Sequence, residues 1–390
     1  MTSKPKTHSL SLVFPRTTVH GGALGVMAWA IHALQSQYTL HVYTLDECDP
    51  DSWNASFGTE IDRTIIQWNS YSSDHPKIAF WLNKRKMFTL DQYVLMKWVD
   101  SKIASNSLPF SLHNEMSFST KGLQYIHFPM LMTGRKDLSR RMGQSGSIQK
   151  EMYGWACKMI FNKKKSDFTK NISLCNSRYI EKVFQEYYGH HISTNCLYPP
   201  ITSSPRLYNL PWGQRENGVI MIGRTVPDKR FEDGLEILKQ CRQLGSKLSL
   251  HIVSSDGNPE YTKWITEQTE NLSWVTWHRK VDRTGLQKLC GRVKYGLHCN
   301  HGEHFGMSTA EMMTSQCLVF GHDSGGTKEI LLCPEQRYDT ISKAVENILK
   351  LTKSPELQKF ILEKSYAHAA SFSSAQFCKT IQEIVSDTMG

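Results

Sequence analysis

Features that would indicate a membrane-spanning, exported or zinc-binding protein are missing from this sequence. No apolar run approaches the roughly 20 residues of a spanning helix, and the first residues lack the apolar core of a signal peptide. None of the ten cysteines forms a CxxC pair, so a zinc ribbon or thioredoxin-type site has no support. We therefore expect a cytoplasmic protein without a disulfide framework.

The composition is typical of a folded chain, but its charge is uneven. The 390 residues exceed the ~100–200 of one domain, so we expect two domains. With 10 Trp, 15 Tyr and 16 Phe, the chain has the aromatic residues to build their cores. The formal net charge is +10, and residues 77–170 alone hold 17 Lys and Arg against 6 Asp and Glu. Such a surface either binds anionic partners or is a solvated face of a basic protein.

Along the first half of the chain, β-rich runs alternate with helical patterns, which predicts a parallel sheet covered by helices. The strands expected there are Leu10–Phe14, Leu40–Thr44, Lys77–Leu82, Gln124–Phe128, Ile172–Asn176 and Asn195–Tyr198. A Pro- and Ser-rich stretch at 198–205 is the best linker.

After the linker the alternation restarts. The strands expected in the second half are Gly218–Gly223, Leu248–Ser254, Trp274–Trp277, Val293–Asn300 and Leu318–Phe320. We expect Rossmann-like domains at 1–200 and 206–372, followed by a helical segment at 373–390. Two such α/β units imply a cleft between them, with ligands bound beyond the carboxyl ends of the strands.

The most specific motif follows the predicted strand that ends at Asn300. Glu303 and Glu311 lie eight residues apart, with Phe305, Gly306, Met307 and Ser308 between them. A glycine at 306 allows close approach of the backbone to a ligand, and the free N–H groups of a helix beginning there suit a phosphate. Glu303 and Glu311 can each accept hydrogen bonds from sugar hydroxyls. The alternative is a helix-terminal acid and a surface glutamate.

This Glu-x7-Glu motif with Phe-Gly inside it resembles the signature of retaining glycosyltransferases of the GT-B fold, family 4. The resemblance implies two Rossmann-like domains facing a central cleft, with the C-terminal helix packing back towards the first domain. It further implies that Glu303 contacts the donor sugar and that Glu311 contacts the ribose of the nucleotide. His-Phe-Pro, Tyr-Pro-Pro, Glu-His-Phe-Gly and Ser-Gly-Gly together are most similar to the mannosyltransferases that extend dolichol-linked oligosaccharides on the cytosolic face.

A second motif, Gly223-Arg224-x4-Lys229, follows the first strand of the second unit and resembles the Gly-Arg-x4-Lys turn of that family. There the two cations hold the diphosphate. Fixed positive charge is what a departing diphosphate requires, because its developing negative charge is the main obstacle to reaction. Without the family context, such a turn is a solvated loop.

In the first unit the resemblance extends to two further places. Gly21 and Gly22, before a predicted helix, allow backbone N–H groups to face a pyrophosphate or an acceptor. His127 ends a strand where the family has a histidine facing the donor sugar; a core histidine is the alternative. Shorter matches are Asn176-Ser177 and the turn Ser324-Gly325-Gly326-x-x-Glu329.

Together these motifs predict transfer of a hexose from a nucleotide-diphosphate sugar, GDP-mannose or a UDP-sugar, to a hydroxyl acceptor, either lipid-linked or a glycan. Arg224, Lys229, Glu303 and His127 are the expected catalytic residues. Gly21, Gly22, Phe305, Gly306, Met307, Ser308 and Glu311 are expected to bind the donor. We expect retention by front-face displacement, because no pair of carboxylates stands at the reacting centre. The nucleotide-diphosphate sugar is a co-substrate; no cofactor and no metal are expected, because the cations replace a metal.

Two other functions stay open from the residues alone. One is a sugar-nucleotide epimerase of the same architecture. The other is a nucleic-acid-binding protein, although no nucleic acid is expected, since the basic surplus and the phosphate motifs lie in different halves of the chain. The basic region 77–170 is predicted to be an acceptor-side surface for an anionic bilayer or a phospho-linked acceptor. Its basic groups are Lys84–Lys86, Arg135-Lys136, Arg140-Arg141 and Lys163–Lys165, beside Met87, Phe88, Trp155, Met159 and Phe161.

Overall fold

The computed structural model describes residues 8–18, 21–85, 87–135, 137, 148–202, 208, 210–255 and 257–390, without the side chains of 85 and 148–150. Among these residues no helix is long and apolar enough to cross a membrane. The chain divides into two compact units. Unit 1 runs to Pro200 and takes in the C-terminal Ser374–Gly390, and unit 2 covers Ile201–Ser373.

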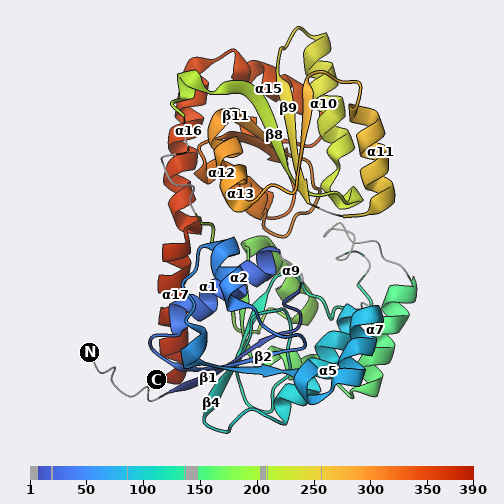
Figure 1. Cartoon of the computed structure of the whole chain (residues 1–390), viewed down its shortest axis with the longest axis vertical. Helices are drawn as coiled ribbons and strands as arrows, with labels where there is room; N and C mark the ends of the chain where they lie inside the picture. The colour runs from blue at the N-terminus through green and yellow to red at the C-terminus, as the bar shows by residue number, and fades with distance from the viewer. Residues whose placement is uncertain are drawn as a thin grey trace. The chain divides into compact units, whose positions relative to one another are not determined.

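Unit 1 is built on a parallel sheet of seven strands in the order β3-β2-β1-β4-β5-β6-β7 (Figure 1). Its strands are β1 Ser9–Phe14, β2 Thr39–Thr44, β3 Ile66–Ser70, β4 Ser107–Ser111, β5 Leu123–Ile126, β6 Ile172–Cys175 and β7 Thr194–Cys196. The chain runs outwards from β1 to β3 and returns to β4 on the other side of β1. The strand order therefore reverses between β1 and β4, and the loops after these two strands meet at the carboxyl edge of the sheet.

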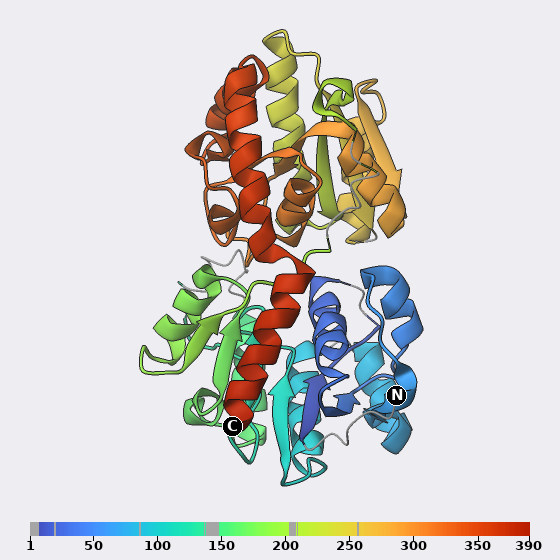
Figure 2. The ribbon, with the colours of Figure 1, turned by 90° about the vertical axis from the view of Figure 1, so that its left-hand side faces the viewer.

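Helices cover this sheet, and the last of them comes from the far end of the chain. The helices of unit 1 are α1 Gly22–Leu34, α2 Pro50–Phe57, α3 Tyr71–Asp74, α4 Pro76–Arg85, α5 Phe88–Asp100, α7 Ile148–Ile160, α8 Lys165–Thr169, α9 Arg178–Tyr188 and α17 Ser374–Met389. Figure 2 shows α17 running along the body of unit 1. Its buried stripe Phe377, Ile381 and Val385, spaced four residues apart, joins the core formed by α1 and β1.

Unit 2 repeats the plan with six parallel strands in the order β10-β9-β8-β11-β12-β13. They are β8 Glu216–Arg224, β9 Ser249–Ser255, β10 Val275–Arg279, β11 Val293–His298, β12 Leu318–His322 and β13 Arg337–Tyr338. The helices are α10 Phe231–Gln243, α11 Pro259–Thr269, α12 Arg283–Arg292, α13 Met307–Thr314, α14 Thr327–Ile330, α15 Ile341–Thr352 and α16 Pro355–Ala369. Here the strand order reverses between β8 and β11.

One expected strand is wrong. Residues 77–82 form the middle of helix α4, which begins at Pro76, a residue suited to the first turn of a helix because it lacks an N–H. Ala79 and Leu82 are buried at a spacing of three residues, whereas Ile78, Phe80 and Trp81 are exposed. The apolar run that resembled a buried strand is therefore a helix with an apolar outer face.

Candidate functional site

The loops after β8 and β11 bring Lys229 and Glu303 into direct contact at the reversal point of the unit 2 sheet. Lys229 Nζ lies 2.7 Å from Glu303 Oε2. The two side chains are 22 % and 16 % exposed, so the pair is partly buried but reachable from solvent. The motifs that the sequence placed 74 residues apart thus form one site.

Lys229 reaches Glu303 because the end of β8 leaves room for its side chain. Lys229 closes the short turn Pro227–Lys229, and its aliphatic part runs over Gly223. A Cβ at position 223 would lie 3.2 Å from Lys229 Cγ, tighter than an ordinary contact. Arg224 is the last residue of β8 and is exposed. Both predicted cations therefore stand at the same strand end.

Glu303 has two further polar neighbours from β11 and the residues after it. Asn300 Nδ2 donates a hydrogen bond to Glu303 Oε2 at 2.9 Å, and His298 Nε2 lies 3.2 Å from the same oxygen. Burial tends to raise the pKa of Glu303, but the Lys229 ammonium and His298 outweigh it and hold that pKa well below its usual range. Glu303 is therefore a carboxylate at neutral pH, and it accepts hydrogen bonds rather than giving a proton.

The Ser324-Gly325-Gly326 turn supports the Glu303 loop from behind. Gly302 N donates to Ser324 Oγ at 2.8 Å, and Gly326 N donates to the Glu303 carbonyl oxygen at 2.7 Å. Gly325 has a φ of +63°, and a Cβ there would lie 2.3 Å from the Glu303 carbonyl oxygen. The two glycines are therefore needed for the close packing of two backbones.

The start of α13 follows directly. Gly306 adopts a φ of +111° immediately before the helix, which favours glycine, and Phe305 beside it is buried. Ser308 Oγ lies 3.4 Å from His298 Nδ1, so His298 touches both the Glu303 side chain and the first turn of α13. Glu311 is the fifth residue of α13; burial raises its pKa, and Arg283 opposes that shift.

His127, the predicted catalytic histidine of the first half, lies in unit 1 directly after β5. Asn114 Oδ1 accepts from the backbone N–H groups of His127 and Phe128, at 2.8 and 3.1 Å. Asn176 Nδ2 donates to the His127 carbonyl oxygen at 3.0 Å, and His127 Nε2 lies 3.1 Å from the Leu112 carbonyl oxygen. The loop that carries His127 is thus fixed by two asparagines, one of them from the predicted Asn176-Ser177 turn.

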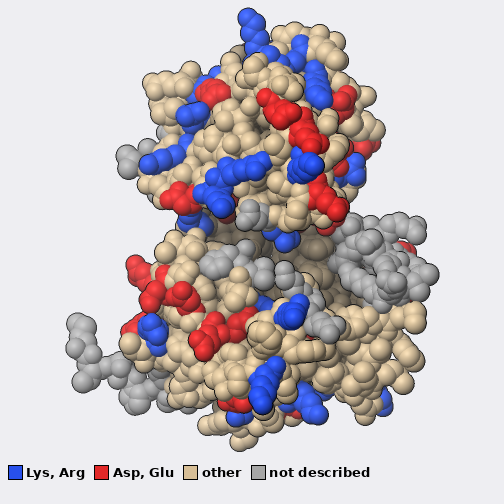
Figure 3. Space-filling view, turned by 45° about the vertical axis from the view of Figure 1, so that its right-hand side comes forward, with Lys and Arg blue, Asp and Glu red and all other residues tan. Residues whose placement is uncertain are grey.

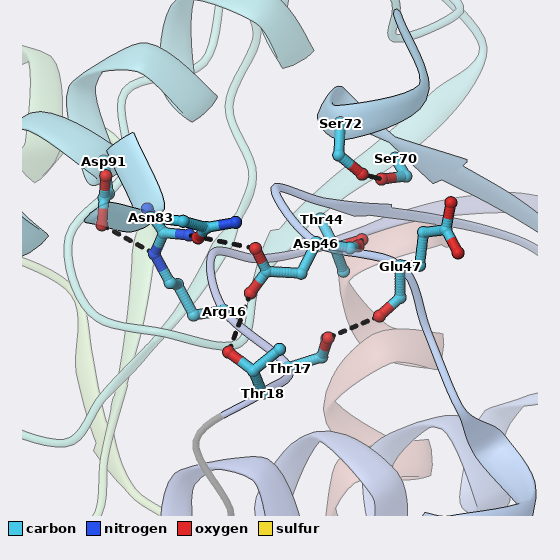
Figure 4. A network of polar contacts seen from close by, with 10 residues as sticks. All are labelled: Arg16, Thr17, Thr18, Thr44, Asp46, Glu47, Ser70, Ser72, Asn83 and Asp91. Carbon is cyan, nitrogen blue, oxygen red and sulfur yellow. Dashed lines mark hydrogen bonds and ion pairs between the residues drawn. The ribbon is translucent and has the colours of Figure 1, made fainter. Parts of the chain in front are cut away.

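Gly21 and Gly22 begin helix α1 in unit 1, Gly21 as its N-cap and Gly22 as its first residue. His20 of that motif lies outside the described residues. The segment just before it is anchored by Arg16, which bonds Asp91 at 2.8 Å and Asp46 at 3.0 Å and also contacts Asn83 (Figure 4). Thr18 joins the same network through Asp46 at 3.1 Å.

The predicted residues therefore fall into two groups. Unit 2 gathers most of them at one edge of its sheet: Arg224, Lys229, Glu303, Phe305, Gly306, Met307, Ser308 and Glu311. Unit 1 holds Gly21, Gly22 and His127. The sequence did not reveal the roles of His298 and Asn300, whose only signal is that they are polar residues at and just after the end of a mostly buried strand.

Known sequences are similar to this chain over one unit or over most of its length. The family model described as Glycosyl transferases group 1 matches residues 209–366, which covers most of unit 2. A Dictyostelium discoideum protein named GDP-Man:Man(3)GlcNAc(2)-PP-Dol alpha-1,2-mannosyltransferase is 22 % identical over 98 % of this chain and 86 % of its own length. A mouse protein of the same name is 21 % identical over 93 % of this chain and 83 % of its own.

Solved structures share the fold at lower identity. Anabaena Alr3699/HepE in complex with UDP-glucose superposes with a TM-score of 0.67 at 13 % identity, covering 97 % of this chain and 99 % of the other. WaaG, a glycosyltransferase involved in lipopolysaccharide biosynthesis, gives a TM-score of 0.62 at 12 % identity, covering 96 % and 99 %. The two parallel α/β sheets are therefore those of the GT-B fold, as the sequence predicts. The family match favours a transferase over the epimerase and nucleic-acid alternatives.

Proposed function

The chain belongs to the group 1 glycosyltransferases, and on that premise we propose that it transfers a hexose, with retention at the anomeric carbon, from a nucleotide-diphosphate sugar to a hydroxyl of a lipid-linked oligosaccharide. The observation that carries the proposal is the Lys229–Glu303 pair at the reversal point of the unit 2 sheet. It combines a cation suited to a diphosphate with an anion suited to sugar hydroxyls in one reachable place.

Lys229 and Arg224 act on the leaving group. As the bond from the anomeric carbon to the diphosphate breaks, negative charge grows on the phosphate oxygens, and fixed cations stabilise that charge more than they stabilise the bound donor. Without donor, Lys229 is neutralised by Glu303. Binding therefore moves Lys229 from a carboxylate to a phosphate oxygen, and it releases Glu303 Oε2 for a hydroxyl of the hexose.

Glu303 serves as a permanent acceptor rather than as a nucleophile or acid. Its pKa, held well below the usual range by Lys229 and His298 against the effect of burial, keeps it charged. Asn300 and His298 fix the carboxylate from the side of β11. In the proposal Phe305 and Gly306 let the chain approach the donor closely, the N–H groups of Met307 and Ser308 face its diphosphate, and Glu311 accepts from the ribose.

The acceptor hydroxyl attacks on the face that the diphosphate leaves. Its proton passes to the departing phosphate oxygen. The new glycosidic bond forms as the bond between the anomeric carbon and the diphosphate breaks, and no protein carboxylate bonds covalently to the sugar. His127 and the backbone at Gly21 and Gly22 are the unit 1 residues proposed to orient the reacting sugar and the acceptor. GDP-mannose is the preferred donor in the proposal, and a dolichol-linked oligosaccharide is the preferred acceptor, because the relatives carry both in their names.

A donor screen followed by product analysis tests the proposal. Each of GDP-mannose, UDP-glucose and UDP-N-acetylglucosamine is added to the full chain, and thermal unfolding is recorded; a donor at ~100 times its Kd adds about 2.7 kcal/mol of stability. The stabilising donor is then incubated with a lipid-linked oligosaccharide, and the new linkage is read by nuclear magnetic resonance. An α-linked product is expected from an α-linked donor. Failure of every nucleotide sugar to stabilise the chain, or a product of inverted configuration, contradicts the proposal.

A further inference from the structure

Helix α7 in unit 1 carries an apolar stripe on its outer side. Met152, Trp155 and Met159 are 66 %, 59 % and 62 % exposed, and their spacing of three and four residues places them on one face. Cys157, on the opposite face, is buried. A surface helix normally presents polar residues outwards, so this helix has its apolar side towards solvent in the isolated chain.

Two neighbouring segments extend the exposed apolar surface. Helix α4 exposes Ile78, Phe80 and Trp81, and the first residue of α5, Phe88, is 55 % exposed. Helix α7 contacts the first turn of α5, where Tyr153 Oη accepts from Leu90 N at 3.0 Å, and α5 follows α4 directly in the chain. Of the 15 exposed large apolar side chains in the described residues, eight lie on α4, the start of α5 and α7. Large exposed apolar patches on soluble units mark interaction surfaces.

The exposed charges beside these side chains are few, and on α4 they are basic. Helix α4, Pro76–Arg85, contains no acidic residue, and its Lys77 and Lys84 are exposed beside Phe80 and Trp81. On α7, Lys158 and Glu151 are half-buried. In Figure 3, for which the side of Figure 1 with α5 and α7 is brought forward, much of the right-hand surface of unit 1 is free of charged residues.

Other members of the basic region are held elsewhere. Lys163 Nζ donates to Ser117 Oγ at 3.1 Å, and Lys165 lies over the Tyr187 ring at 3.9 Å. Phe161 stacks on Tyr93 with ring centroids 5.2 Å apart. Arg140 and Arg141, together with Lys86 and Lys136, lie outside the described residues.

We propose that the outer faces of α4 and α7, together with Phe88, form a docking face for the surface of an anionic lipid bilayer. Lysines interleaved with Trp, Phe and Met are suited to such a boundary, since apolar side chains enter the acyl region while ammonium groups stay with anionic headgroups. Trp81 and Trp155 are the amphipathic rings that prefer this depth. A second copy of the chain fits less well, because a two-fold symmetric contact would bring together two copies of a face whose exposed α4 charges are both positive.

The docking face deepens the proposed function and rests on it in one respect, the lipid-linked acceptor, which lies in a bilayer. It is also tied to the predicted glycine loop. Asn83 of α4 and Asp91 of α5 are both partners of Arg16, which precedes Gly21 and Gly22. Docking through α4 and α5 thus holds the start of that loop at a fixed place relative to the membrane surface.

The test is sedimentation of the full chain with phosphatidylcholine vesicles prepared with and without phosphatidylserine. Two variants remove the two components of the face: M152S/W155S/M159S and K77E/K84E. Matched controls in unit 2 change as many exposed side chains of the same kinds: L244S/W264S/F360S, and K263E/K359E, whose lysine side chains are 80 % and 79 % exposed. Thermal unfolding of each variant reports whether it folds.

Wild type and both controls are expected to pellet with phosphatidylserine vesicles at low salt. The apolar variant is expected to bind at least about tenfold more weakly. The lysine variant is expected to bind at least about 25-fold more weakly, since each basic residue near an anionic surface contributes about fivefold and each glutamate adds repulsion. If the apolar variant does not fold, the lysine variant alone tests the docking face.

Three results overturn the docking face. The first is a wild type that stays in the supernatant at low salt, and the second is equal binding by the variants and their controls. The third is a wild-type dimer that dissociates in the apolar variant, which would assign the face to a second copy. Donor-induced stabilisation and transfer to a detergent-solubilised acceptor are measured on the same variants. A wild type that does not bind vesicles but keeps both refutes the docking face alone, whereas a wild type that shows neither donor stabilisation nor transfer refutes the proposed function.

Discussion

The two units place the same kinds of groups at equivalent positions and use them differently. β1 and β4 of unit 1 occupy the places that β8 and β11 occupy in unit 2. In each unit a cation follows the first strand, Arg16 or Lys229, and a glutamate follows the fourth, the buried Glu115 or the partly buried Glu303. In unit 2 the cation and the glutamate form one pair. In unit 1 Arg16 bonds Asp46 and Asp91 instead.

The glutamate of unit 1 is left to backbone and hydroxyl donors. Glu115 accepts from Met130 N at 2.9 Å, from Leu131 N at 3.3 Å and from Tyr188 Oη at 3.0 Å. Burial outweighs these bonds and raises the pKa of Glu115 to about 7, whereas the pKa of Glu303 is held well below its usual range. The adjacent cation thus makes the difference between the two glutamates. Glu303, beside Lys229, stays a carboxylate that can bind a ligand, whereas Glu115 is a structural anchor that titrates near neutral pH.

The largest expected effect is on stability and comes from breaking the unit 1 cation network. Arg16→Ala leaves Asp91 and Asp46 buried without their cation, which costs about 3–5 kcal/mol. Arg63→Ala is the matched control, because Arg63 and its partner Asp51 are 65 % and 70 % exposed and such a pair contributes about 0–1 kcal/mol. Chemical unfolding measures both. Equal costs of the two substitutions would contradict the contrast.

Removing the unit 2 cation is expected to affect catalysis more than folding. Lys229→Ala should lower kcat about 10²–10³-fold, as for other fixed groups that meet developing charge, with a smaller change in donor affinity. Steady-state kinetics with the stabilising donor measure this, and Lys263→Ala, an 80 % exposed lysine of the same unit, is the control. An unchanged kcat would remove Lys229 from the mechanism. Partial recovery in Lys229→Arg would identify charge as the property that matters.

The contrast between the two units also explains how much of the fold and of the site can be predicted from the sequence. Alternation of apolar strands and helices predicts two parallel sheets, although β3, β4 and β13 are not among the expected strands. The motifs predict that Lys229 and Glu303 share one site. Strand β4 was not predicted, because Pro109 lies in its middle and proline is disfavoured within a sheet. Pairing with β5 begins only at Phe110, so the missing N–H of Pro109 removes no bond on that side.

Helix α4 was predicted as a strand because of its apolar residues. A pattern rule assumes that apolar residues are buried, and Ile78, Phe80 and Trp81 are exposed. His298 and Asn300 could not be assigned roles, because their contacts with Glu303 depend on the curvature of the loop 299–306 rather than on spacing. The sequence therefore predicts the groups that chemistry needs, while the groups that hold them require the fold.

Glu115 gives a pH test of the comparison. Its folded pKa of about 7 lies above the ordinary 4.5 of a glutamate. The unfolded chain therefore loses this proton first, and stability that is full below the ordinary pKa is lost as pH rises through about 7, by about 3 kcal/mol at most. In Glu115→Gln this loss should vanish, so variant and wild type should diverge with rising pH. Thermal unfolding across that range checks it, and parallel curves would contradict it.

The smallest expected effect tests whether the glycine turn supports Glu303. Gly325 and Gly245 both have positive φ, +63° and +87°, so alanine strains the backbone at each. Only at Gly325 would the new Cβ also meet the Glu303 backbone; at Gly245 nothing lies within 4 Å. Gly325→Ala should therefore cost about 1–3 kcal/mol more stability than Gly245→Ala, and it alone should lower kcat/KM. Because the strain is shared, the difference between the two variants isolates the contact, and equal losses of stability and activity would show that the turn does not position Glu303.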